Sequence, residues 1–148
     1  MVTEEMNENN HMEAAFQEGR KAMEEGEVPV GCVFVFNNEI IARGHNTTNA
    51  TLNATRHAEM NCIDQVLLLC SRQNLDPKST FRNISVYVTV EPCAMCAPAL
   101  GRLGIQNITY GWECDRFGGC GAMVDASAMY GYNFKVTKGV RKQEAVDL

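Results

Sequence analysis

No stretch of the sequence approaches the roughly 20 consecutive apolar residues that a membrane-spanning helix requires. The first residues, MVTEEMNENN, also lack the basic, apolar and small-residue segments of a secretory signal. Repeats, low-complexity tracts and long linkers are missing as well. These absences exclude a membrane protein and a secreted one. They indicate a single intracellular domain over residues 1–148, in the cytoplasm, the nucleus or both, with residues 1–9 disordered.

An excess of positive charge is also absent, because 18 Asp and Glu residues outnumber 13 Lys and Arg residues and give a formal net charge of -5. This balance excludes a strongly basic protein that binds nucleic acid alone, although it leaves room for a local basic patch or for help from a partner. The seven cysteines are an odd number, and an intracellular compartment keeps thiols reduced. A disulfide framework is therefore not expected.

What the sequence does contain is an alternation of helical and strand periods. In chain order, the pattern predicts helix 11–26, strands 30–36 and 39–44 joined by an Asn-Asn turn, helix 56–70 capped by Thr55, strand 84–90, a helix from Pro92 to Gly101 or Gly104, strand 105–111, a helical stretch over 123–129, strand 133–139 and helix 141–148. This order predicts an α/β fold with one mixed five-stranded sheet between two layers of helices. The hairpin should be antiparallel, and the later strands, which helices connect, should be parallel.

Two short motifs gather residues that bind metals. RHAEM contains His57 and Glu59 where one helix is expected to start, and EPCAMC contains Cys93 and Cys96 where the next one starts. Cysteines three positions apart in a first helical turn face the same side, and the positive end of the helix dipole favours their thiolate forms. His57, Cys93 and Cys96 therefore suit a tetrahedral zinc ion with a fourth position left for water. Glu59 is the nearby group that can carry protons.

Two other interpretations of these motifs remain open. A closed structural zinc site would need a fourth protein ligand, and the candidates are Cys62, Cys114, Cys120 and His45. Such a site would leave Glu59 without a role. A thioredoxin-like redox pair would use Cys93 and Cys96 alone, and the neighbouring His-x-Glu would then be a coincidence.

The combination of His-x-Glu with Pro-Cys-x-x-Cys resembles the signature of zinc-dependent nucleoside and nucleobase deaminases. Further segments, EVPVGCVFV, GHN, ATRHAEM, YVTVEPCAMCA and YGWECDRFGGCG, resemble the tRNA adenosine deaminases over about residues 10–148. The DRFGGCG loop looks most like the catalytic subunit of the eukaryotic two-subunit enzyme. The resemblance implies the cytidine-deaminase-like fold and hydrolytic deamination of adenosine to inosine at the wobble position of the tRNA anticodon.

The resemblance also implies roles for single residues. His57, Cys93 and Cys96 would hold Zn²⁺, and Glu59 would shuttle protons between water and the base. Asn46 of GHN matches an asparagine that contacts the nucleoside, and Val30 matches an apolar wall of the base pocket. The alternative for Asn46 is an ordinary turn asparagine, and for Val30 a strand residue in the core.

The family also implies partners, namely the tRNA anticodon loop and a related non-catalytic subunit in a heterodimer, with a homodimer as the alternative. Its members continue into a further C-terminal helix and a basic tail that this sequence is expected to lack, although Lys135, Lys138, Arg141 and Lys142 could begin that basic surface. Two rival functions remain. One is a deaminase of a free base, nucleoside or nucleotide of the cytosine, guanine or deoxycytidylate type. The other is a non-catalytic RNA-binding subunit, which the presence of Glu59 disfavours.

Overall fold

One mixed sheet organises the chain. The computed structural model describes residues 4–114, 118–121, 125, 131–132 and 134–148. The five strands lie in the order β2-β1-β3-β4-β5, with bounds β1 Gly31–Phe36, β2 Glu39–His45, β3 Ile84–Val90, β4 Asn107–Trp112 and β5 Lys135–Thr137. Strand β1 is antiparallel to β2 and β3, whereas β3, β4 and β5 are parallel. The predicted sheet, hairpin and parallel strands are confirmed.

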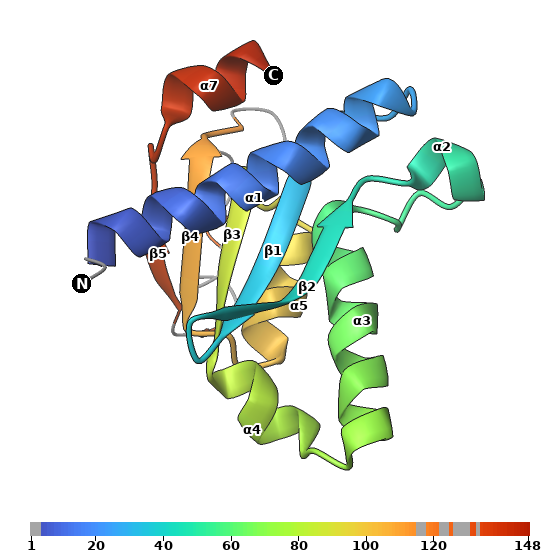
Figure 1. Ribbon diagram of the computed structural model, residues 1–148, viewed down its shortest axis with the longest axis vertical. Helices are drawn as coiled ribbons and strands as arrows, with labels where there is room; N and C mark the ends of the chain where they lie inside the picture. Colours follow the sequence, from blue (N-terminus) through green and yellow to red (C-terminus); the bar gives the residue numbers. More distant parts are fainter. Residues whose placement is uncertain (1–3, 115–117, 122–124, 126–130, 133) are drawn as a thin grey trace.

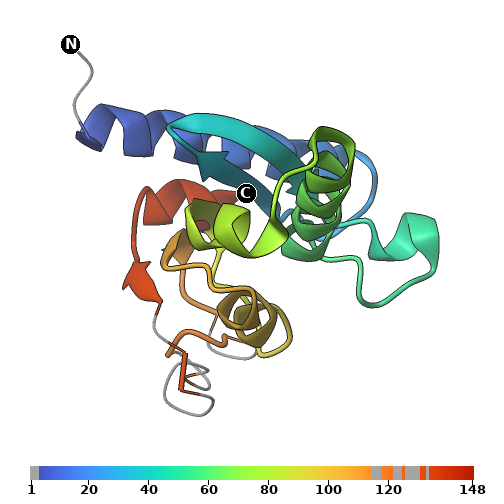
Figure 2. The same ribbon diagram turned by 90° about the horizontal axis from the view of Figure 1, so that it is seen from below.

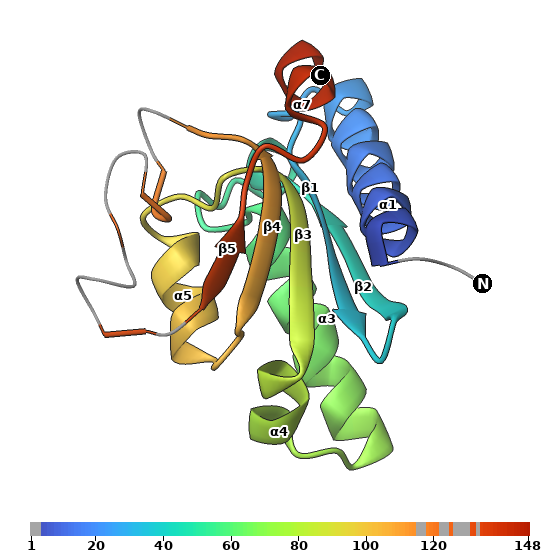
Figure 3. The same ribbon diagram turned by 90° about the vertical axis from the view of Figure 1, so that its left-hand side faces the viewer.

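Helices cover both faces of this sheet. Helices α1 (Glu4–Glu24) and α7 (Lys142–Asp147) lie on one face, and α3 (Ala58–Gln73) and α5 (Cys96–Arg102) lie on the other (Figures 1 and 3). Figure 2 shows α1 and α5 on opposite sides of the strands. The predicted three-layer α/β/α architecture is therefore confirmed.

The strands alternate between two apolar cores. Cys32 and Phe34 of β1 belong to the cluster that also contains Val66 of α3 and Leu100 of α5. The intervening residues of β1 pack with α1 in a smaller cluster. This period of two is what a sheet with helices on both faces requires.

Two short helices were not predicted. Helix α2 (Thr48–Thr51) lies in the polar segment after β2, and α4 (Pro77–Arg82) lies in the loop before β3. Asp76 caps α4 by accepting the Ser79 amide at 3.2 Å, and Pro77 occupies its first position. The Asp76-Pro77 pair therefore starts a helix.

Helix α1 begins earlier than the prediction. It starts at Glu4, so residues 4–9 of the segment that we expected to be disordered are helical. Acidic residues at the start of a helix are favourable beside the positive end of its dipole. The expected helical stretch over 123–129 falls on positions that, apart from residue 125, lie outside the described residues.

The starts of α3 and α5 also differ from the prediction. His57, not Thr55, is the N-cap residue of α3, and Thr55 instead bonds to the Asn53 side chain in the preceding turn. Helix α5 starts at Cys96 rather than near Pro92, because Cys93 forms an isolated antiparallel bridge with Gly118 and the chain turns before becoming helical.

Strand β2 forms one edge of the sheet, and a side chain from α3 covers part of its backbone. The Gln65 side chain accepts the Arg43 amide at 3.1 Å and donates to the Arg43 carbonyl at 2.6 Å. Both backbone groups of this edge residue are thereby satisfied.

The C-terminal helix α7 is attached to α1 through Arg141. The Arg141 guanidinium donates to Glu13 Oε1 at 2.9 Å and lies 4.7 Å from the centre of the Phe16 ring. It also pairs with Glu144. No helix among the described residues is long and apolar enough to cross a bilayer.

Candidate active site

The sequence-predicted site residues lie together at one end of the sheet, the end at which its parallel strands finish. Strand β2 ends there at His45, followed by Asn46, and antiparallel β1 starts there just after Val30. Parallel strands β3 and β4 finish at the same end of the sheet, and β3 leads directly into the loop that carries Cys93. Ends of neighbouring strands are where open α/β sheets place their sites.

His57, Cys93 and Cys96 form a compact group of metal-ligand atoms. The Sγ atoms of Cys93 and Cys96 lie 3.6 Å and 3.5 Å from His57 Nδ1, and all three ligand atoms are within 4.8 Å of one another. Tetrahedral zinc, with bonds of about 2.3 Å to sulfur and about 2.0 Å to nitrogen, separates a sulfur from a nitrogen ligand by about 3.5 Å. The donor types and their spacing therefore fit zinc.

The environment of the cysteines favours a thiolate. Hydrogen bonding from the Cys96 side chain lowers the pKa of Cys93 to about 4, and the Cys96 amide also donates to Cys93 Sγ at 3.4 Å. The shared proton and burial raise the pKa of Cys96. The hydrogen bond to Cys93 also raises the pKa of His57. A cation at this point would replace these protons, since metal ligands bind in their deprotonated forms.

Glu59 lies in the first turn of α3, two residues after His57, and is almost completely buried, with 3% of its surface exposed. The pKa of Glu59 is raised to about 7, chiefly by burial and in part by Cys93, while a backbone hydrogen bond and His57 oppose the shift. Among the described residues, no lysine or arginine forms an ion pair with Glu59. A carboxyl group in this environment can gain or lose a proton near neutral pH.

The four candidates for a further protein ligand lie elsewhere. Cys62 donates to the Cys32 carbonyl at 3.5 Å, and His45 Nε2 lies 2.8 Å from Glu25 Oε2. Cys114 and Cys120 are not part of the ligand group either. Within the described part of the chain, only His57, Cys93 and Cys96 gather around one point, which leaves a tetrahedral ion one open position.

Asn46 and Val30 are neighbours at the start of α3. The Asn46 side chain is buried and its Oδ1 accepts the Ala58 amide at 2.8 Å, so that it satisfies one of the free N–H groups of α3. The Asn46 amide donates to the Val30 carbonyl at 3.3 Å, and the half-buried Val30 packs against the main core. Asn46 therefore lies beside the first turn of α3, at the residue between His57 and Glu59 in sequence, and Val30 contacts Asn46 through its backbone.

Sequence reasoning missed Glu91, which precedes the cysteine loop. Its side chain is 3% exposed and accepts the amides of Cys114 at 3.1 Å and Cys120 at 2.8 Å. The only sequence signal was the placement of an acid directly between a buried strand and Pro92, with a glycine pair at 118–119.

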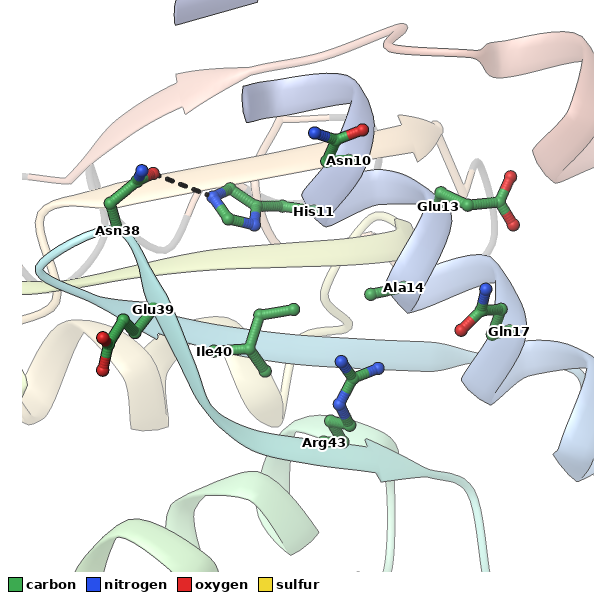
Figure 4. Close-up of a pocket in the computed structure, with 9 residues that line it drawn as sticks. All are labelled: Asn10, His11, Glu13, Ala14, Gln17, Asn38, Glu39, Ile40 and Arg43. Carbon is green, nitrogen blue, oxygen red and sulfur yellow. Dashed lines mark hydrogen bonds between the residues drawn. The ribbon is translucent and has the colours of Figure 1, made fainter. Parts of the chain in front are cut away.

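A polar hollow lies on the other face of the sheet, between α1 and the β1–β2 hairpin (Figure 4). His11 Nε2 lies 3.3 Å from Asn38 Oδ1 within it. None of His57, Glu59, Cys93 and Cys96 lines this hollow, so it is separate from the ligand group.

Comparisons with known proteins agree with this geometry. Residues 5–112 match the family described as the cytidine and deoxycytidylate deaminase zinc-binding region. The chain is 49% identical to tRNA-specific adenosine deaminase 2 of Danio rerio over 93% of its length, and it spans 66% of that relative. It is 45% identical to tRNA-specific adenosine deaminase 2 of Xenopus tropicalis, with 99% of this chain and 88% of the relative covered. A solved structure from studies of A-to-I editing by tRNA:A34 deaminases at the wobble position superposes with a TM-score of 0.82 at 30% identity, covering 94% of this chain and 98% of that one.

Proposed function

Because the chain belongs to the tRNA-specific adenosine deaminases, within the cytidine and deoxycytidylate deaminase family, we propose that it converts adenosine to inosine at the wobble position of the tRNA anticodon by hydrolysis. The observation that carries this proposal is the buried carboxyl group of Glu59 beside a His/Cys/Cys group whose spacing suits zinc. If the chain were instead a non-catalytic RNA-binding subunit, this carboxyl group would have no role.

His57, Cys93 and Cys96 would hold the zinc ion through one nitrogen and two sulfurs. When bound, zinc supplies Lewis acidity that lowers the pKa of water to about 7. This set of two thiolates and a neutral imidazole would make the site formally neutral, so that loss of a proton from water is not opposed by excess negative charge.

Glu59 would move the protons of the reaction. It accepts one proton from the attacking water, the water oxygen bonds to C6 of adenine, and Glu59 passes that proton to ring nitrogen N1. It then carries the second proton from the added oxygen to the 6-amino group. The C6–N bond breaks, ammonia leaves and inosine remains. Burial, which raises the pKa of Glu59, favours a group that must both accept and donate a proton.

Asn46 and Val30 would bind the nucleoside. The oxygen of the Asn46 side chain is engaged by the Ala58 amide, and its NH2 group would be the donor to the nucleoside. Val30 would contribute an apolar wall for the base. The target nucleotide must be unpaired to reach these groups, and an anticodon loop meets that condition.

The chain would act with a related deaminase-like subunit that lacks the catalytic glutamate, with a second copy of itself as the alternative. The acidic balance supports a partner that supplies positive charge for RNA. Lys138 pairs with Glu113 and Arg141 pairs with Glu13 and Glu144, so two of the four residues expected to begin a basic surface are neutralised. Leu67 and Leu68 of α3 are 43% and 50% exposed and would suit an apolar subunit contact.

The cell compartment would be a reducing one, the cytoplasm or the nucleus. All seven cysteines are free thiols, and the ligand group needs both Cys93 and Cys96 in that state.

The test compares substrates. The zinc-loaded chain, alone and with candidate partner subunits, is incubated with tRNA, free nucleosides, guanine, cytosine and deoxycytidylate. Inosine at the wobble position of tRNA is the expected product. Deamination of a free base, nucleoside or nucleotide without any change in tRNA would instead establish the rival enzyme class. Wild-type tRNA editing by a Glu59→Ala assembly would assign the chemistry to another subunit.

A further inference from the structure

Two loops that are distant in sequence meet at the ligand group. The first contains Pro92 to Cys96, and the second runs between Cys114 and Cys120, of which the structure describes the ends and Gly118–Gly119. The Gly119 amide donates to the Pro92 carbonyl at 2.7 Å, and Gly118 pairs with Cys93 in an antiparallel bridge. The second loop therefore lies directly against the backbone of a metal-ligand residue.

Glu91 joins the two ends of this second loop. One carboxylate oxygen accepts the Cys114 amide at 3.1 Å, where the loop begins, and the other accepts the Cys120 amide at 2.8 Å, where it ends. Burying a carboxylate is costly unless hydrogen bonds replace its water, and these two amides provide that replacement. Loss of either bond would leave a buried polar group unsatisfied.

The glycine that lies over the carboxyl group has no room for a side chain. A Cβ at Gly118 would be 2.5 Å from the carboxyl carbon and from both oxygens of Glu91. A Cβ at Gly119 would be 2.5 Å from the Cys93 carbonyl oxygen. The contact between the two loops thus depends on small residues on one side and on a buried acid on the other.

We infer that Glu91 is a positioning residue, which holds Cys114 and Gly118–Cys120 against its carboxylate and thereby holds the Cys93 backbone in its ligating position. The effect on the metal is indirect, because the Glu91 side chain is occupied by backbone amides. The inference builds on the zinc site of the proposed function, but its test uses no RNA and measures no deamination.

The test uses Glu91→Gln in the full chain loaded with zinc. Glutamine keeps the shape of the side chain but replaces one acceptor oxygen with a donor, so that either the Cys114 or the Cys120 amide loses its partner. We expect bound zinc to remain at one ion per chain, because all three ligands are intact. Hydrogen exchange in a peptide covering residues 113–121 should become about fivefold to 30-fold faster, and zinc transfer to an excess of chelator should accelerate by a similar factor.

Glu27→Gln is the matched control. Glu27 is also buried and accepts two backbone amides, from Asn49 and Ala50, each at 2.9 Å, but it fixes helix α2 rather than the cysteine loop. This variant should increase exchange around residues 48–51 without changing the rate of zinc release. Equal acceleration of zinc release in both variants would reduce Glu91 to a general structural role.

Gly118→Ala disrupts the same contact between Gly118 and the Glu91 carboxyl group by changing the glycine. It serves as the test if Glu91→Gln folds poorly. We expect faster zinc release here too, and a double variant whose effect is smaller than the product of the two single effects, because both changes break one contact. Wild-type rates of zinc release in Glu91→Gln, or in Gly118→Ala, would overturn the inference. Failure of the wild-type chain to bind zinc would instead count against the proposed function.

Discussion

The two faces of the sheet place their acidic groups in different surroundings. On the α1 side, the buried Glu18 accepts from Lys21 at 2.7 Å and lies 3.4 Å from His45, while Arg141 joins Glu13 to Glu144. On the α3 side, Glu59 is equally buried, and no lysine or arginine among the described residues pairs with it.

This difference separates structural from chemical use of the same side chain. An acid beside a cation keeps its charge, as the lowered pKa of Glu13 beside Arg141 illustrates. Burial without such a partner raises the pKa of Glu59 to about 7. A group that changes charge near neutral pH can transfer protons, so the contrast identifies the face on which catalysis is expected.

The largest expected effect comes from removing a metal ligand. Cys93→Ala leaves two protein ligands for zinc, so we expect loss of both bound zinc and inosine formation. Metal analysis of the purified variant, together with the tRNA assay, measures both. Retention of one zinc per chain with full activity would contradict the assignment of Cys93 as a ligand.

Removal of the Glu59 carboxylate should lower the catalytic rate without affecting zinc binding. Glu59→Gln keeps the shape and burial of the side chain but cannot accept the proton of water. We expect zinc content to stay at the wild-type level while kcat falls by about 10²- to 10⁴-fold or more, the usual range for loss of a general acid–base. Single-turnover assays on tRNA provide the measurement, and an undiminished rate would mean that another group moves the proton.

A smaller effect separates the two interpretations of Asn46. Asn46→Asp retains an oxygen that can accept the Ala58 amide, but it loses the amide donor proposed for the substrate. We expect kcat/KM to fall by about twofold to tenfold while the cap of α3 is kept, because an ordinary hydrogen bond to substrate contributes about 0.5–1.5 kcal/mol. Asn46→Ala is the control and should lose stability as well. Unchanged kcat/KM in Asn46→Asp would assign Asn46 to helix capping alone.

The smallest effect is expected on the face of the sheet that α1 covers, where acidic side chains form ion pairs. Arg141→Ala removes a guanidinium that is about one-fifth exposed together with its contact to Phe16, and we expect about 1 kcal/mol lower free energy of unfolding at pH 7. Because the pKa values of Glu13 and Glu144 are lowered in the folded chain, the stabilisation is present above the usual value of 4.5. The part that comes from the ion pairs should disappear as the pH falls through the lowered values, whereas the contact with Phe16 should remain. Urea unfolding of both proteins at several pH values is the measurement, and a difference that stays constant down to pH 2 would exclude the ion pairs as its source.

Local residue patterns anticipated much of the fold and the ligand group. The alternation of Cys32 and Phe34 with their neighbours reflects strand periodicity, and the spacing of Cys93 and Cys96 reflects the geometry of a chain that enters a helix. These properties depend on residues close together in sequence. For the same reason the sheet with helices on both faces could be predicted from the order of its elements.

The missed contacts around the site join distant segments. The amide that starts α3 is capped by Asn46, which lies 12 positions away, rather than by Thr55. The carboxylate of Glu91 accepts amides 23 and 29 positions further along the chain. Every residue except proline has a backbone amide, so the residue pattern does not indicate which amides it binds. The delayed start of α5 has the same origin, because it follows from the bridge between Cys93 and Gly118.

The covering of strand β2 by Gln65 limits how this molecule can associate with others. A carboxamide carries the same donor and acceptor as a peptide bond, so at Arg43 it imitates the next strand of the sheet. A foreign segment that tried to extend the sheet there would first have to displace Gln65 and would gain no new hydrogen bonds at that residue. Strand addition at this position of β2 is therefore disfavoured.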